Sequence, residues 1–114
     1  MPIMSQHVKE ITAADYEREV AASAEPVVLD FFSTECPPCD ALAPKFEAVA
    51  EQFAGRVRFL KVFRQGNREL ATKLGVTGSP TLIFFRSGQE VGERLGGDDV
   101  KRSAIKAQVE ALLS

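Results

Sequence analysis

The sequence lacks tryptophan and has one histidine, one tyrosine and two cysteines among its 114 residues. A tetrahedral zinc site normally takes about four nitrogen or sulfur ligands. Cys36, Cys39 and the distant His7 do not reach that number within this chain. The shortage of ligands argues against an intrachain zinc site and leaves other chemistry for the two cysteines.

Long apolar stretches and a strong charge of one sign are also missing. No segment approaches the roughly 18 apolar residues of a membrane-spanning helix, and residues 1–7 lack the basic and apolar parts of a signal peptide. The 14 Lys and Arg nearly balance the 16 Asp and Glu, for a formal net charge of −2. We therefore expect no membrane or nucleic-acid partner and, unless a leader was removed, a cytoplasmic protein.

The chain is 45% apolar, which suits one compact domain over residues 1–114. Strands are predicted over residues 7–11, 27–33, 56–63, 81–86 and 89–95, and helices over residues 12–22, 37–54, 67–74 and from a cap at Asp98-Asp99 onward. The resulting order is β-α-β-α-β-α-β-β-α. Alternation predicts parallel strands, and the tight Ser87-Gly88 turn predicts an antiparallel pair. The expected fold is α/β, with a mixed, mostly five-stranded sheet and helices on both faces.

Both cysteines lie in one short segment, Cys36-Pro37-Pro38-Cys39, between an apolar run and a helical pattern. Two cysteines on a strand-to-helix turn suit reversible dithiol–disulfide exchange, because the helix N-terminus favours a thiolate on the first of them. The spacing alone is also compatible with half of a zinc site or with a structural bridge. A bridge of this length constrains the unfolded chain little.

Asp30 interrupts the apolar run before the cysteines. An ionised carboxylate in a buried strand is costly unless it is paired or reached by water. Lys61, in the next predicted strand, is a candidate partner, or it extends along apolar surface to solvent. Asp30 is therefore either an ordinary paired acid or a group that exchanges protons.

Taken together, these features resemble the thioredoxin family over nearly the whole chain. The resemblance is carried by Asp30 in a strand, Cys36-Pro37-Pro38-Cys39 at a helix start, Pro44 inside that helix, Lys61 in the next strand, the loop Gly78-Ser79-Pro80-Thr81, Gly88 and Gly96. It implies a thioredoxin fold and a thiol–disulfide oxidoreductase that reduces protein disulfides through a reversible Cys36–Cys39 disulfide.

The resemblance also implies roles for single residues. Cys36 would be the exposed nucleophile and Cys39 the resolving thiol. Asp30 would move a proton to or from Cys39 through water, with Lys61 tuning its charge.

Substrate binding is implied for the loop that contains a cis Pro80. The backbone of Gly78 and Ser79 would take the substrate as an added strand, with Glu35 and Gly96 at the borders of the docking site. No bound cofactor is implied, since the sulfurs carry the electrons. A flavin-containing thioredoxin reductase would regenerate the dithiol, and the protein would be a monomer.

The chain departs from the usual family pattern around the cysteines. Glu35 stands where the family has Trp, Pro37 replaces Gly, and Asp40 stands where Lys or Arg is common. The two acids disfavour a neighbouring thiolate because like charges repel. Ser79 replaces a bulkier residue, so the docking surface is more polar and the expected substrate range narrower.

Two other functions remain open on the same fold. One is a disulfide oxidase or isomerase, and the other is a non-catalytic binding module. Four arginines form either a docking patch or a solvated face; they are Arg56, Arg58, Arg64 and Arg68.

Overall fold

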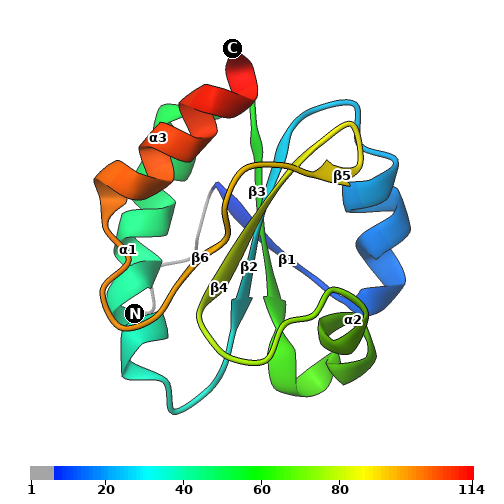
Figure 1. Ribbon diagram of the computed structural model, residues 1–114, viewed down its shortest axis with the longest axis vertical. Coiled ribbons are helices and arrows are strands. Elements are labelled where there is room, and N and C mark those ends of the chain that lie inside the picture. Colours follow the sequence, from blue (N-terminus) through cyan, green and yellow to red (C-terminus); the bar gives the residue numbers. More distant parts are fainter. Residues whose placement is uncertain (1–6) are drawn as a thin grey trace.

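A central twisted sheet with helices on both sides dominates the computed structural model, which describes residues 7–114 (Figure 1). The strands are β1 (Val8–Ile11), β2 (Val27–Phe32), β3 (Arg58–Phe63), β4 (Thr81–Arg86), β5 (Gln89–Glu90) and β6 (Leu95–Gly96). Their order is β1-β3-β2-β4-β5, with β6 also paired to β4. β1, β3 and β2 are parallel, whereas β4 is antiparallel to β2, β5 and β6. The predicted mixed sheet of an α/β protein is confirmed.

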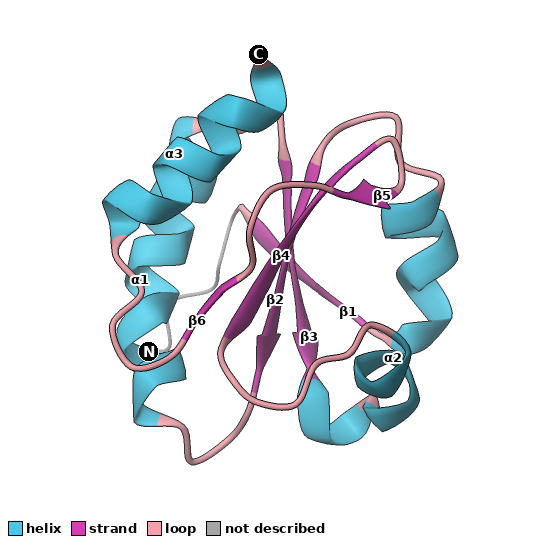
Figure 2. Ribbon diagram, in the orientation of Figure 1, coloured by secondary structure: helices cyan, strands magenta, loops and turns pink. Residues whose placement is uncertain are grey.

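The helices divide between the two faces of the sheet (Figure 2). The longer ones are α1 (Pro37–Gln52), α2 (Arg68–Lys73) and α3 (Arg102–Leu113). The short 3-10 helices are η1 (Ala13–Asp15) and η3 (Arg64–Gly66), and η2 (Glu17–Ala21) is a π-helical segment. Apolar residues of α1 and α3 pack on one face of the sheet, and residues of η2 and α2 pack on the other.

β2 lies at the centre of the sheet and is buried on both faces. Val28 points into the α1–α3 cluster, while Leu29 and Phe31 join the opposite cluster, and each of the three is fully buried. Hydrogen-bonded neighbours on both edges, β3 and β4, leave no side of this strand to water. An almost continuous apolar run is what such a strand requires. The sheet therefore holds the end of β2 firmly, and the cysteine segment follows directly.

Three predicted elements are wrong in detail. The helix predicted over residues 12–22 is two short irregular pieces, η1 and η2. The strand predicted over residues 89–95 is interrupted, because Gly92 adopts a left-handed φ of 70° between β5 and β6. The last helix starts at Arg102 rather than after Asp98-Asp99, because the Asp99 carboxylate binds the Lys101 ammonium at 3.0 Å instead of capping a helix.

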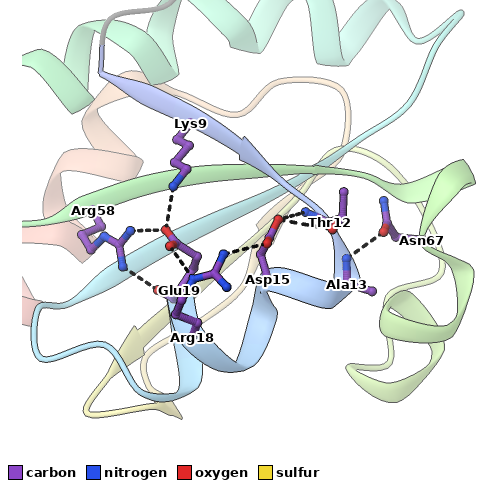
Figure 3. A network of polar contacts seen from close by, with 8 residues as sticks. All are labelled: Lys9, Thr12, Ala13, Asp15, Arg18, Glu19, Arg58 and Asn67. Atoms are coloured by element: carbon purple, nitrogen blue, oxygen red, sulfur yellow. Dashed lines mark hydrogen bonds and ion pairs between the residues drawn. The ribbon is translucent and has the colours of Figure 1, made fainter.

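A buried glutamate ties η2 to the sheet (Figure 3). Glu19 is only 7% exposed, and its carboxylate accepts hydrogen bonds from Arg58 Nη2, Lys9 Nζ and Arg18 Nε. Arg58 also donates to the Glu19 backbone carbonyl at 2.9 Å. Burial alone would raise the pKa of Glu19, but the donors from Arg58 and Lys9 outweigh it, so the pKa is lowered. The network joins η2 to β1 and β3.

Replacing Glu19 by Gln should therefore destabilise the protein by about 1–3 kcal/mol at pH 7, because charged donors lose their buried acceptor. A lowered folded pKa contributes stability above the unfolded value of 4.5, and this contribution is lost as the pH falls through the folded value. Urea unfolding at pH 7 and pH 3 measures both effects. Glu110→Gln, on the exposed side of α3, is the matched control. An equal loss for Glu19→Gln at both pH values would contradict the assignment.

Candidate active site

Cys36 and Cys39 are joined by a disulfide at the N-terminus of α1, immediately after β2. Cys36 is the N-cap residue of the helix, and its Sγ accepts a hydrogen bond from the Cys39 backbone N–H at 3.2 Å. Pro37 and Pro38 fill the first turn, where a helix has N–H groups without intrahelical partners, so their missing N–H costs little. The helix runs on through Pro44 to Gln52. The sequence thus places one sulfur at the positive end of a long helix.

Exposure does not distinguish the two cysteines in this disulfide form. Each is 8% exposed, so the expectation of an exposed Cys36 is wrong here. The loop before β4 lies against the disulfide, with the Ser79 carbonyl oxygen 3.8 Å from Cys36 Sγ. Attack on the sulfur therefore has to come past this loop.

The peptide bond between Ser79 and Pro80 is cis, as predicted. Thr81 Oγ1 donates to the Gly78 carbonyl at 2.8 Å and closes the loop locally. Gly96 of β6 lies against it, and a Cβ at that position would be 2.8 Å from the Pro80 carbonyl oxygen. Only glycine fits this approach of two backbones. The predicted residues Gly78, Ser79, Pro80 and Gly96 are thus brought together.

The Ser79 side chain belongs to a polar cluster that the sequence interpretation missed. Its Oγ lies 2.6 Å from Ser33 Oγ and accepts from Arg64 Nε at 2.8 Å. Next to Arg64, Gln65 Oε1 accepts from both the backbone N–H and the hydroxyl of Thr34, at 3.0 and 3.1 Å. The η3 helix therefore connects the loop before the cysteines to the loop with the cis proline.

A signal for this cluster was present in the topology. β2 and β3 are parallel, so the residues that directly follow them, Ser33-Thr34 and Arg64-Gln65, meet at one edge of the sheet. β4 runs the other way, so its first residues lie at the same edge. Figure 1 shows this edge at the lower end of the sheet, beside the start of α1.

Asp30 is buried on the face that α1 covers. It is 6% exposed and lines a cavity of about 490 Å³ together with Lys61, Pro44, Phe46 and Glu47, among others. Within residues 7–114 its Oδ1 has no hydrogen-bond partner. Burial raises the pKa of Asp30 to about 7, and the charge of Lys61 opposes this only in part. Asp30 is poised to exchange a proton near neutral pH.

Lys61 and Asp30 are register partners on neighbouring strands, yet they form no ion pair in the described part of the chain. The Lys61 ammonium instead lies 5.2 Å from the centre of the Phe32 ring. The interpretation of Asp30 as an ordinary paired acid is therefore wrong. The positive charge of Lys61 lowers the pKa of Asp30 without direct contact between the two groups.

Glu35 directly precedes Cys36 with a left-handed φ of 52°, and its side chain is exposed. The four arginines do not gather into one patch. Arg58 binds Glu19. Arg56 lies over the Phe53 ring at 4.9 Å. Arg56 precedes β3 and Arg64 follows it, so the two lie beyond opposite ends of this strand. No group of three or more His, Cys, Asp or Glu side chains within residues 7–114 is arranged to hold a metal ion.

A disulfide on a helix N-terminus after the central strand, faced by a cis proline, defines a thiol–disulfide oxidoreductase with a thioredoxin-like fold. Residues 7–111 match the family model described as Thioredoxin. The chain therefore belongs to the thioredoxin family. None of the helices within residues 7–114 has the length and apolar character needed to cross a membrane.

Curated relatives agree with this assignment. The chain is 31% identical over 108 residues to a thioredoxin of Pseudomonas aeruginosa, covering 95% of this chain and 98% of that protein. It is 31% identical over 107 residues to a thioredoxin of Allochromatium vinosum, with 94% and 98% covered. For a thioredoxin of Malassezia sympodialis the identity is 33% over 105 residues, with 91% and 100% covered. These relatives support protein disulfide reductase activity.

Proposed function

We propose that this chain is a single-domain protein disulfide reductase that works through its Cys36-Pro37-Pro38-Cys39 motif. The observation that carries the proposal is the position of Cys36. It is the N-cap of α1, it accepts the Cys39 N–H, and the Ser79 carbonyl lies 3.8 Å from its sulfur. The helix N-terminus and the N–H donor favour a thiolate at this sulfur.

In the reduced protein, the Cys36 thiolate attacks one sulfur of a substrate disulfide. A mixed disulfide forms, and the other substrate sulfur leaves as a thiolate. The Cys39 thiolate then attacks Cys36 Sγ, the second substrate sulfur leaves, and the Cys36–Cys39 disulfide closes. Two electrons pass to the substrate, and protons from solvent complete its two thiols.

Asp30 takes the proton from Cys39 in the second step. Its support is threefold: a cavity beside it, an oxygen that no described residue binds, and a pKa of about 7. A base whose pKa lies near the working pH transfers protons efficiently. Lys61 limits the rise of the Asp30 pKa and so keeps this group useful at neutral pH.

The substrate chain docks on the Gly78-Ser79-Pro80 loop by backbone pairing. This is supported by the Ser79 carbonyl beside Cys36 Sγ and by the close approach of Gly96 to Pro80. Glu35 borders the same surface with its exposed side chain. The regenerating partner in the cytoplasm is a flavin-containing thioredoxin reductase, and the protein acts as a monomer.

Insulin reduction by dithiothreitol tests the proposed activity. The protein should accelerate precipitation of insulin chains well above background, and Cys36→Ser should remove the acceleration, because no thiolate is left to attack. A wild-type rate equal to background, with Cys36 reduced and reactive, would favour a binding module. The potential of the Cys36–Cys39 couple against glutathione separates a reductase from an oxidase, since about 30 mV corresponds to about 1.4 kcal/mol.

A further inference from the structure

Arg64 binds the loop that lies against the redox sulfur, and most of its hydrogen-bonding capacity is unused. Its Nε donates to Ser79 Oγ at 2.8 Å, and Ser79 in turn places its carbonyl 3.8 Å from Cys36 Sγ. A guanidinium has five N–H donors. Within residues 7–114, the two terminal nitrogens of Arg64 donate to no acceptor, and no carboxylate pairs with it.

Three other arginines of the chain are paired with acids. Arg18, Arg58 and Arg94 each bind a carboxylate, at Asp15, Glu19 and Glu90 respectively. Arg56, Arg68, Arg86 and Arg102 also bind no carboxylate of residues 7–114, but these four are exposed. Arg64, at the docking loop, is likewise unpaired. It is half-buried and fixed in direction by Ser79 and by the bond between Ser79 Oγ and Ser33 Oγ.

This fixation matters for recognition. A guanidinium binds a carboxylate best when both of its terminal N–H groups face it, and a guanidinium held in advance loses little conformational freedom on binding. The Nε contact uses one edge of Arg64 and leaves the terminal nitrogens for a ligand. Gln65 anchors the same short helix to Thr34. The cation is therefore presented to a docked substrate rather than left to move freely.

We propose that Arg64 is a specificity-determining residue that binds the carboxylate of an Asp or Glu next to the target cysteine of the substrate. The inference rests on the proposed reductase function and names its preferred substrate class, disulfides with an acidic neighbour. A substrate strand paired with Ser79 directs alternate side chains to either side. The neighbour on the η3 side then meets Arg64, while Glu35 and Asp40 carry the opposite charge at the start of α1.

The test compares disulfide-linked peptides that differ only in having Glu or Gln on either side of the cysteine. For the wild type, kcat/KM should be about three- to tenfold higher for the Glu peptide, the range expected for a partly exposed charged pair. The preference should shrink at 1 M salt, because added ions screen the interaction. Arg64→Gln keeps an N–H donor for Ser79 but removes the charge, so it should make the two peptides equivalent. Arg64→Lys should restore part of the preference.

Arg56→Gln is the matched control, because it removes the same charge beyond the other end of β3, about 20 Å away for a strand of this length. It should leave the ratio unchanged. Equal kcat/KM for both peptides with the wild type would overturn the inference alone. The inference is also overturned if Arg64→Gln lowers kcat/KM by the same factor for both peptides, because Arg64 would then only support the loop. If the wild type reduces neither peptide, the reductase function itself is wrong.

Discussion

Replacing Cys39 by Ser should abolish turnover and leave the substrate covalently attached to Cys36. The mixed disulfide still forms, because Cys36 keeps its place at the N-terminus of α1. It cannot be resolved, because no thiol remains three residues away to attack Cys36 Sγ. We expect kcat/KM for protein disulfides to fall by about three orders of magnitude or more, as for loss of a group in a covalent mechanism.

Mass spectrometry and non-reducing gels measure the trapped complex, which dithiothreitol should release. Cys36→Ser is the matched control and should trap nothing. A Cys39→Ser protein that also carries Ser33→Ala tests the docking loop. The Ser33 hydroxyl contacts this loop through Ser79 Oγ, at 2.6 Å. Attachment of substrate through Cys39 in the Cys36→Ser protein would reverse the roles assigned to the two cysteines.

Replacing Asp30 by Asn should remove a large part of the pH dependence of stability. The pKa of Asp30 is raised from 3.8 to about 7 by burial. The folded state therefore holds this proton more tightly than the unfolded state. Stability from this group is complete below pH 3.8 and is lost as the pH rises through 7. The loss amounts to about 4 kcal/mol, since each pKa unit corresponds to about 1.4 kcal/mol.

Asp30→Asn should thus match the wild type near pH 3.5 and be more stable above pH 8. Urea unfolding of the disulfide form from pH 3.5 to 9 measures the difference between the two curves. The same change should slow resolution of the mixed disulfide by about 100-fold, the order of a lost general base. Asp98→Asn is the control, because Asp98 is exposed. Parallel curves for the wild type and Asp30→Asn would show that Asp30 titrates as an ordinary acid.

The central part of the fold could be predicted because burial leaves a direct trace in the sequence. β2 and β4 are mostly apolar on both faces and appear as nearly continuous apolar runs, with Asp30 the exception in β2. The end of the chain was harder to predict. Asp98-Asp99 carries a capping signal, but Asp99 turns to Lys101, and a local pattern does not show which partner an exposed acid takes. Gly92 likewise interrupts a strand through its φ, which the residue type permits without requiring it.

The residues of the candidate site also divide into those that the sequence predicts and those that it does not. Cys36, Cys39 and Pro80 were accessible from the sequence because they are contiguous or follow a known motif. Arg64 was named only as one of four arginines of a possible patch, and Gln65 was not singled out. Their roles depend on contacts with Ser79 and Thr34 across 15 and 31 residues of sequence. The missing ion pair between Asp30 and Lys61 was also beyond the sequence. Register places the two residues side by side, but the Phe32 ring decides where the ammonium lies.

The two edge strands of the sheet, β1 and β5, are short and carry exposed polar or charged side chains. β1 has four residues with Lys9 and Glu10 exposed, and β5 has only Gln89 and Glu90, both exposed. Short, charged edge strands are poor templates for adding a foreign strand or a second copy of the chain. A protein that binds unfolded or extended segments at one loop risks nucleating aggregates along its open sides. Here the edge strands are too short and too charged to do so, which leaves the loop next to Cys36 as the proposed place for a substrate strand.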